Sequence, residues 1–219
     1  MIKNLQIFGG LAAILEATIY IIAFIIYGAV LEYPPVGADA MTEMKFLQDN
    51  LLILSVMNLV VYVLFGVLLC VLVLALHDRV KLKAPVLAQM ATVFGLIWVA
   101  LVIASGMIGN IGLTSVLKLQ ATDIGQAMTV WNGVGIVTEG LGGGNEVVGG
   151  LWVLLLSIAG LQTKVLSKPL NVLGILVGSS GILSIYPAEI FTEIFGLSQI
   201  IWFIWVGVLL IKSNEVTSE

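Results

Sequence analysis

Long apolar stretches separated by short polar segments dominate this sequence. Six of them are long enough, at about 20 residues, to cross the ~30 Å hydrocarbon core of a bilayer as helices. They are predicted near residues 7–31, 50–76, 85–109, 138–162, 169–187 and 190–211. The two outer loops, 32–49 and 110–137, are too long to be simple turns. The pattern therefore predicts an all-α, polytopic helical bundle with six transmembrane helices, forming one domain over residues 1–219.

The charge content places this bundle in a membrane. Hydrophobic residues make up 60% of the chain and charged residues 10%, and the mean hydropathy is +1.14. Soluble domains carry about 25% charged residues. We therefore expect an integral membrane protein with the lipid bilayer as its surroundings. The net charge is −4 and the bases lie in loops and at the termini, so no nucleic-acid partner is expected.

The positive charges predict an orientation. If the six helices alternate in direction, seven bases fall on one side of the membrane: Lys3, Arg79, Lys81, Lys83, Lys164, Lys168 and Lys212. Only Lys45 and Lys118 fall on the other side. Cytoplasmic loops are enriched in Lys and Arg. We therefore expect both termini in the cytoplasm and a multi-pass protein of the inner (plasma) membrane.

The two outer loops contain apolar residues of their own. Met41, Met44, Phe46 and Leu47 indicate a short interfacial helix within 32–49. Segment 110–137 either extends the third helix above the membrane or lies along the membrane surface.

Glu16 is the most unusual residue of the first helix. It stands about ten residues from the inner helix end, or roughly 15 Å deep at 1.5 Å per residue. No predicted span contains a Lys, Arg or His that could pair with it. A carboxylate in hydrocarbon is costly and in most cases functional. Glu16 is therefore expected to be neutral, hydrated or balanced by a proton, a metal cation or a cationic ligand.

Other polar residues stand at a similar predicted depth. They are Tyr20, Asn58, Tyr62, Ser179 and Ser180. These groups could hydrogen-bond a protonated Glu16 carboxyl, or complete an oxygen cage around a cation that Glu146 closes from above. The alternative is structural, because a protonated glutamate hydrogen-bonded to tyrosine or asparagine also holds membrane helices together.

The stretch "VTEGLGGGNEVVGG" (137–150) combines acids with glycines at regular spacing. Asn132, Glu139 and Glu146 recur every seven residues, with Gly135, Gly142 and Gly149 between them, which predicts one helix face. Such glycines allow close helix packing, as do Gly174 and Gly178 in "GILVGSSG". Two interpretations stay open. Glu139 and Glu146 are either solvated or protonated acids beside a tight crossing, or part of an ion- or proton-binding site.

Few residues suggest enzyme chemistry. The sequence has no catalytic motif, one histidine (His77) at a helix end and one cysteine (Cys70). We therefore expect neither an enzyme nor a bound cofactor or metal site. Trp98, Trp202 and Trp205 serve either bundle packing or anchoring at the lipid interface.

Two segments carry a family resemblance. "GGLAAILEATIYIIAFIIYG" opens the chain's first helix, and "GGLWVLLLSIAGLQTKVLSKPLNVLGILVGSSGILS" joins a glycine-started helix to a glycine-rich one through a basic turn and Pro169. This order resembles the bacterial and archaeal membrane proteins grouped as domain of unknown function 4386. The resemblance implies six helices and a similar length, but it supplies no activity. "TEGLGGGNE" is more acidic than the family pattern.

Three functions agree with these features. The first is a small transporter or channel-like protein that binds a proton or a small cation through buried carboxylates. The second is a non-transporting subunit that docks a membrane partner protein or organises a homo-oligomer. The third is a sensor or regulator that binds an apolar ligand between helices.

Overall fold

The computed structural model describes residues 2–143 and 145–212, and the regular structure within them is helical. This confirms the all-α class. Five helical runs in the described chain are long and apolar enough to cross a membrane: Asn4–Val30, Leu51–Val80, Pro85–Leu119, Ile124–Thr163 (which passes over residue 144) and Glu189–Lys212. The fifth predicted span, 169–187, corresponds to the shorter apolar helix Lys168–Leu183.

Contacts divide the chain into two compact units, whereas the apolar pattern predicts one bundle. Unit 1 comprises Met1–Ile21, Phe65–Ala100 and Asn145–Glu219, and unit 2 comprises Ile22–Leu64 and Leu101–Gly144. Two of the long helices, α1 (Ile2–Ile25) and α5 (Pro85–Leu119), contribute residues to both units.

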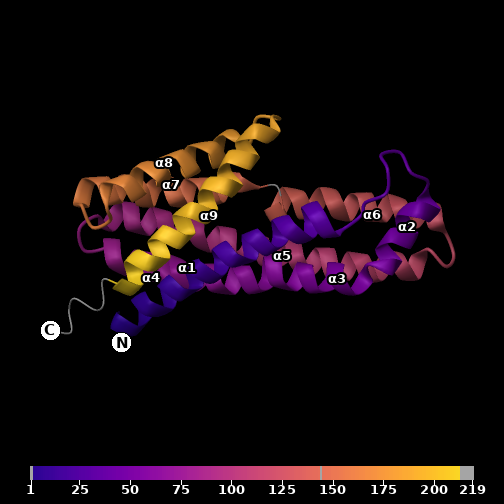
Figure 1. Cartoon of the computed structure of the whole chain (residues 1–219), viewed down its shortest axis with the longest axis horizontal. Coiled ribbons are helices and arrows are strands. Elements are labelled where there is room, and N and C mark those ends of the chain that lie inside the picture. Colours follow the sequence, from indigo (N-terminus) through magenta and orange to yellow (C-terminus); the bar gives the residue numbers. More distant parts are fainter. Residues whose placement is uncertain (1, 144, 213–219) are drawn as a thin grey trace. The chain divides into compact units, whose positions relative to one another are not determined.

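Unit 1 contains a tightly packed antiparallel pair, α7 (Glu146–Thr163) and α8 (Lys168–Leu183), which Figure 1 shows side by side. The chain reverses at Lys164, whose φ of 57° is left-handed. The helices approach so closely that a Cβ on Gly178 would lie 2.8 Å from the Gly150 carbonyl oxygen. α8 also packs on α9 (Glu189–Lys212). Small residues therefore set the spacing of this pair.

Aromatic rings form the centre of unit 1. The Trp152 ring lies 5.9 Å from Trp98 and 5.6 Å from Trp202, between ring centroids. Phe65, the first residue of α4 (Phe65–Val80), makes edge contacts with Trp98 and Phe203. Such pairs contribute about 0.5–1.5 kcal/mol each beyond burial. Trp98 and Trp202 thus have a packing role, whereas Trp205 is 40% exposed.

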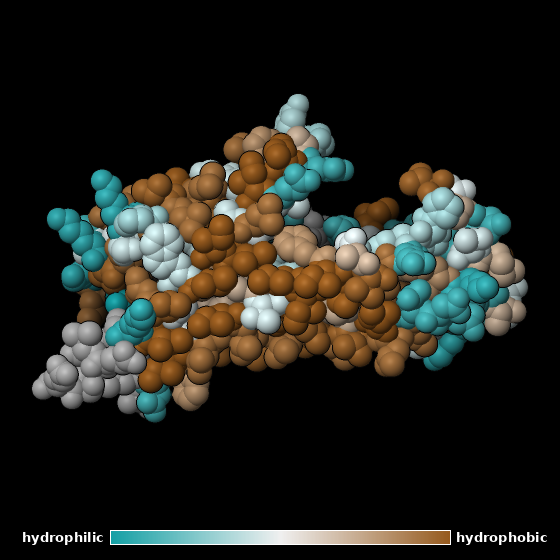
Figure 2. Space-filling model, viewed as in Figure 1, coloured by the Kyte–Doolittle hydropathy of each residue, from teal (hydrophilic) through white to brown (hydrophobic). Residues whose placement is uncertain are grey.

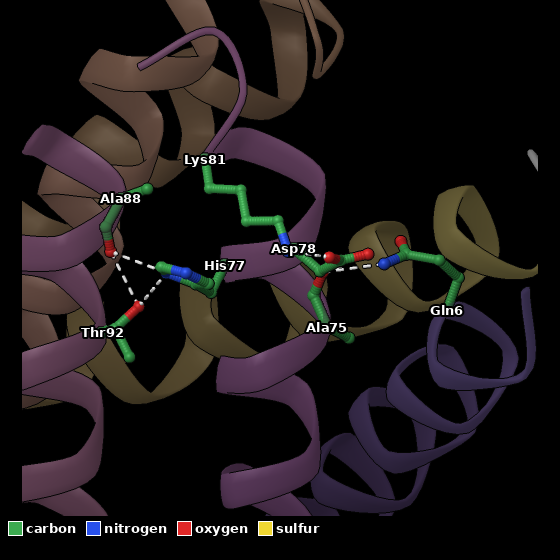
Figure 3. A network of polar contacts seen from close by, with 7 residues as sticks. All are labelled: Gln6, Ala75, His77, Asp78, Lys81, Ala88 and Thr92. Carbon is green, nitrogen blue, oxygen red and sulfur yellow. Dashed lines mark hydrogen bonds and ion pairs between the residues drawn. The ribbon is translucent and has the colours of Figure 1, made fainter. Parts of the chain in front are cut away.

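Polar contacts join helices at one end of unit 1 (Figure 3). The Thr92 hydroxyl donates to the Ala88 carbonyl over 2.7 Å, and His77 Nδ1 lies 2.8 Å from the same hydroxyl oxygen. Because Thr92 has only one hydroxyl proton, His77 Nδ1 must be the donor. His77 therefore links α4 to α5, which is more than the helix-end role expected of it. Gln6 Nε2 donates to the Ala75 carbonyl over 2.8 Å.

Unit 2 builds a smaller core from α2, α5 and α6. α2 (Ala40–Asp49) is the short helix expected within 32–49, and α6 spans Ile124–Thr138. Their buried core residues are Met44, Leu47, Leu113, Val116 and Ala127. Segment 110–137, expected as an outer loop, is largely helical, because α5 continues to Leu119 and α6 begins at Ile124. The first part of the segment thus extends the third helix, and the rest forms a helix of its own.

Three π-helical segments also belong to unit 2. They are η1 (Ile26–Val30), η2 (Asn58–Leu64), which follows α3 (Leu51–Met57), and η3 (Glu139–Gly143), which follows α6. π-Helical turns are rare and are frequent at functional sites.

The helix predicted at 138–162 is interrupted. η3 ends at Gly143, Asn145 is not helical, and α7 begins only at Glu146. The heptad from Asn132 to Gly149 therefore does not lie on one continuous helix face. Glycine has a low helix propensity, costing about 1 kcal/mol relative to alanine, and "GLGGGN" concentrates it here.

The surface agrees with a membrane setting. Figure 2 shows apolar side chains along the length of the helices of each unit, with hydrophilic ones gathered at their ends, in unit 2 around α2. Exposed apolar residues include Phe8, Leu52, Ile136 and Leu197, each at least 60% exposed. Soluble proteins rarely expose large continuous apolar patches. The chain therefore has the apolar surface and the long apolar helices of a membrane protein.

Acid is expected to loosen α2 through its N-cap. The Asp39 side chain accepts a hydrogen bond from the Thr42 backbone N–H over 2.8 Å, and this bond lowers the pKa of Asp39. Because the pKa of Asp39 is lower in the folded protein than in the unfolded chain, the ionised side chain stabilises the fold. This contribution is fully present above the ordinary Asp pKa of ~3.9 and is lost as the pH falls through the lowered pKa. The Thr42 amide resonance should therefore shift as the sample is acidified below about pH 4.

Asp39→Asn is the matched control for this titration. Asparagine caps helices about as well as aspartate but does not ionise. This variant should keep α2 intact and lose the pH dependence of the Thr42 resonance. An unchanged titration in the variant would assign the effect to another acid.

Candidate functional site

Glu16 lies in the interior of unit 1. It is 0% exposed, and neither carboxyl oxygen has a hydrogen-bond partner among the described residues. On α1 it stands between Gly9, which packs against Ala75, and Tyr20, whose ring centroid lies 5.6 Å from Phe65. Glu16 thus lies on the part of α1 between two contacts with the apolar helix α4.

The hydrogen bonds expected from neighbouring hydroxyls to Glu16 are not formed. Ser180 donates instead to its own helix, at the Leu176 and Val177 carbonyls. Tyr20 packs its ring on Phe65 and Phe203, and Ser179 is half-buried. A serine hydroxyl in an apolar helix can donate a hydrogen bond to a carbonyl of the preceding turn, and Ser180 does so.

Gln199 is a second buried polar residue, which the sequence reasoning missed. It is 0% exposed, and within residues 2–143 and 145–212 neither side-chain amide atom has a hydrogen-bond partner. α9 touches α1 where a Cβ on Gly10 would lie 2.7 Å from the Gly207 carbonyl oxygen. A Cβ on Gly207 would in turn lie 2.8 Å from Ile14, and the ring centroids of Tyr20 and Phe203 are 6.2 Å apart, so Glu16 and Gln199 lie on two helices that contact each other. As the only amide within 190–211, Gln199 could have been noticed.

Glu146 has a local structural explanation. It is the first residue of α7 and is 8% exposed. The positive end of the helix dipole favours an acid in the first turn. Its backbone lies against α8, since a Cβ on Gly181 would stand 2.8 Å from the Glu146 carbonyl oxygen. Glu146 thus starts a helix, where an acid is favoured, and its side chain is buried.

Unit 2 contains a pocket of about 420 Å³ that gathers the remaining candidates. Asn58, Tyr62, Gly135 and Glu139 all line it. Glu16, Tyr20, Glu146, Ser179 and Ser180 belong to unit 1. The candidate residues therefore form two separate groups, one in each unit.

The pocket is rich in aromatic rings and hydroxyls. Tyr27, Tyr33 and Trp131 line it together with Tyr62, and Glu43 of α2 adds a second carboxylate. Tyr27, Tyr33, Tyr62 and Glu139 thus gather around one cavity. Sequence reasoning missed Tyr27, Tyr33 and Trp131, because nothing in their spacing indicates a shared cavity.

Close helix packing positions two of these side chains. A Cβ on Gly106 would lie 2.5 Å from the Tyr62 Cβ, and one on Gly109 would lie 3.1 Å from the Asn58 amide nitrogen. α5 therefore presents glycines where η2 approaches it. The Ser105 hydroxyl donates to the Thr138 carbonyl over 2.8 Å and fixes the other wall. Tyr27, Asn58, Tyr62 and Glu139 all come from π-helical segments.

The glycines proposed for packing differ in their surroundings. A Cβ on Gly142 would lie 2.9 Å from Val102 Cα, and one on Gly149 would lie 2.9 Å from the Trp98 ring. Gly174 meets Trp202 and Ser157, and Gly178 meets the backbone of α7. Gly135 differs, because no described atom lies within 4 Å of its Cβ position. It lines the pocket and leaves it open.

Metal ligands do not cluster in the part of the chain that the structure describes. No group of three or more His, Cys, Asp or Glu side chains there is arranged to hold a metal ion. The buried carboxyls there are those of Glu16 and Glu146, and the carboxyls of Glu43 and Glu139 line the aromatic pocket.

Fold and sites together define a polytopic, helical membrane protein whose described residues include a buried carboxyl without a hydrogen bond in one unit and an acidic, aromatic pocket in the other. Comparison with protein-family models, with curated proteins and with solved structures finds no match to this chain.

Proposed function

We propose that this protein is a small transporter or channel-like protein of the plasma membrane that binds a proton or a small cation at Glu16. It spans the bilayer six times with both termini in the cytoplasm. The short helix α8, beside α7, is one of the six spans, in addition to the five long helical runs. It has no enzymatic activity. We place it with the domain of unknown function 4386 proteins, on the two segments quoted above.

One observation carries the proposal. Glu16 is fully buried, and both of its carboxyl oxygens lack a hydrogen-bond partner in the described chain. Burying a polar group without a hydrogen bond costs roughly 2–7 kcal/mol, and burying an ionised one costs more. A group retained at such a cost is commonly functional. Gln199, on the contacting helix α9, is a further fully buried side chain without a hydrogen-bond partner in the described chain.

Flux in liposomes tests this function. The purified protein is reconstituted and proton and monovalent-cation fluxes are recorded as a function of pH, for wild type and Glu16→Gln. The wild type should conduct at least one of these ions, and Glu16→Gln should abolish the flux because glutamine cannot take up or release a proton. Glu193→Gln, an exposed acid of α9, is the matched control and should keep wild-type flux.

Two results would contradict the proposal. The first is a flux that Glu16→Gln leaves intact, which would remove Glu16 from the ion path. The second is silence of the wild type for every ion and pH, with the protein folded. That result would favour a subunit that docks a membrane partner protein or forms a homo-oligomer.

A further inference from the structure

We propose that the pocket of unit 2 binds a small organic ammonium ion, held between tyrosine and tryptophan rings and the carboxylates of Glu43 and Glu139. This site is independent of Glu16 and does not rest on the proposed ion flux.

The lining selects for positive charge. Its two carboxylic acids are Glu43 and Glu139, and no Lys, Arg or His is among the described residues that line it. The nearest base along α2, Lys45, lines an adjoining hollow of about 490 Å³ that shares Tyr33 and Phe46 with the pocket, and Glu32 and Asp49 line that hollow as well. An anion in the pocket would be repelled by the two carboxylates, and no basic residue of the lining would offset this. A cation would be attracted by both carboxylates.

The rings select for an organic cation. Aromatic faces attract ammonium groups within about 6 Å, and aromatic cages recognise quaternary ammonium ions in particular. Tyr27, Tyr33, Tyr62 and Trp131 line one pocket, and Phe46 lies 5.2 Å from the Tyr33 ring, between centroids. A hydrated metal ion prefers a full set of oxygen ligands. A cavity dominated by rings, with two acids, fits an alkylammonium better.

The pocket has suitable size and access. Its volume of about 420 Å³ falls within the ~300–1,000 Å³ typical of small-molecule sites. Tyr33 is 55% exposed, and Glu139 is also exposed, so the cavity communicates with the surface. Gly135 leaves its wall open, since its Cβ position has no described atom within 4 Å.

The backbone adds a further argument. Tyr27, Asn58, Tyr62 and Glu139 enter the pocket from three different π-helical segments. A π turn replaces the regular i→i+4 hydrogen bonds of the α-helix by i→i+5 bonds and is frequent at functional sites. Three such turns around one cavity, each supplying polar side chains, are explained by a bound ligand more simply than by packing.

A pair of isosteric probes tests the site. Full-length protein in lipid nanodiscs is titrated calorimetrically with choline and with 3,3-dimethyl-1-butanol, its neutral carbon isostere. Choline should bind, and the neutral isostere should bind at least about tenfold more weakly, because only the cation gains from the rings and the acids. Glu139→Gln and Glu43→Gln should each weaken choline binding by about tenfold.

Controls separate this site from the rest of the molecule. Glu193→Gln in unit 1 should leave choline affinity unchanged, and so should Glu16→Gln. Each variant is first checked by thermal unfolding, and Glu139 is exposed, so its replacement should not disturb folding. Equal affinity for both probes would overturn the proposal and favour an apolar-ligand sensor. Absence of choline binding at millimolar concentration, or unchanged binding in both acid variants, would also overturn it.

Discussion

Replacing Gly178 by alanine is expected to lower the free energy of unfolding of the purified protein by about 1–3 kcal/mol. The new Cβ would stand 2.8 Å from the backbone nitrogen of Leu154 and from the Gly150 carbonyl oxygen. Backbone atoms inside a helix cannot move aside as a flexible side chain can, so α7 and α8 must separate. Gly178→Leu should prevent their packing altogether.

Gly133→Ala provides the matched control for the glycine contact. Gly133 lies in α6, and no atom of the described chain lies within 4 Å of its Cβ position. Alanine has the higher helix propensity, so this variant should keep or slightly raise the midpoint of thermal unfolding in detergent. Equal destabilisation by both substitutions would show that the close contact at Gly178 does not control stability.

Replacing Glu16 by methionine is expected to raise the free energy of unfolding by about 1–3 kcal/mol while abolishing ion flux. Methionine is unbranched and adaptable, so it can occupy the volume of the glutamate side chain. It removes two buried oxygens that have no hydrogen-bond partner among residues 2–143 and 145–212. Thermal unfolding of wild type and variant in the same detergent measures the change.

Thr92→Val is the contrasting substitution. It also exchanges a polar group for an apolar one of similar shape, but the Thr92 hydroxyl contacts both Ala88 and His77 (Figure 3). Its loss should lower the free energy of unfolding by about 1 kcal/mol. A loss of stability in Glu16→Met would instead mean that Glu16 serves to hold helices together, the structural alternative for this residue.

The helical class and most apolar spans follow from the sequence because hydrophobic length alone determines them. The α2 helix was also predictable from Met44 and Leu47, which do bury against α5 and α6. The helix interruption before Glu146 was not, since the glycines there suit a packed helix and a broken one equally well. The prediction that the regularly spaced glycines lie on one continuous helix face was therefore wrong.

The pocket of unit 2 was harder to predict from the sequence than the buried Glu16. Glu16 stands out in any apolar helix, because a charge there needs an explanation. Tyr27, Tyr33 and Trp131 do not, since aromatic residues are ordinary in membrane helices near an interface. Helices that are apolar all round give no periodicity from which to infer the inward face. A π turn also changes the helical register, so the inward-facing positions no longer follow a period of 3.6 residues.

The length of α8 has a consequence for its place beside α7. Its 16 residues extend only ~24 Å at 1.5 Å per residue, short of the ~30 Å hydrocarbon core. The turn at Lys164 and the glycine contacts with Gly150 hold it against the longer α7. A helix of this length on its own falls short of the hydrocarbon thickness, so the glycine contacts that hold α8 against α7 also keep a short apolar helix beside a longer one.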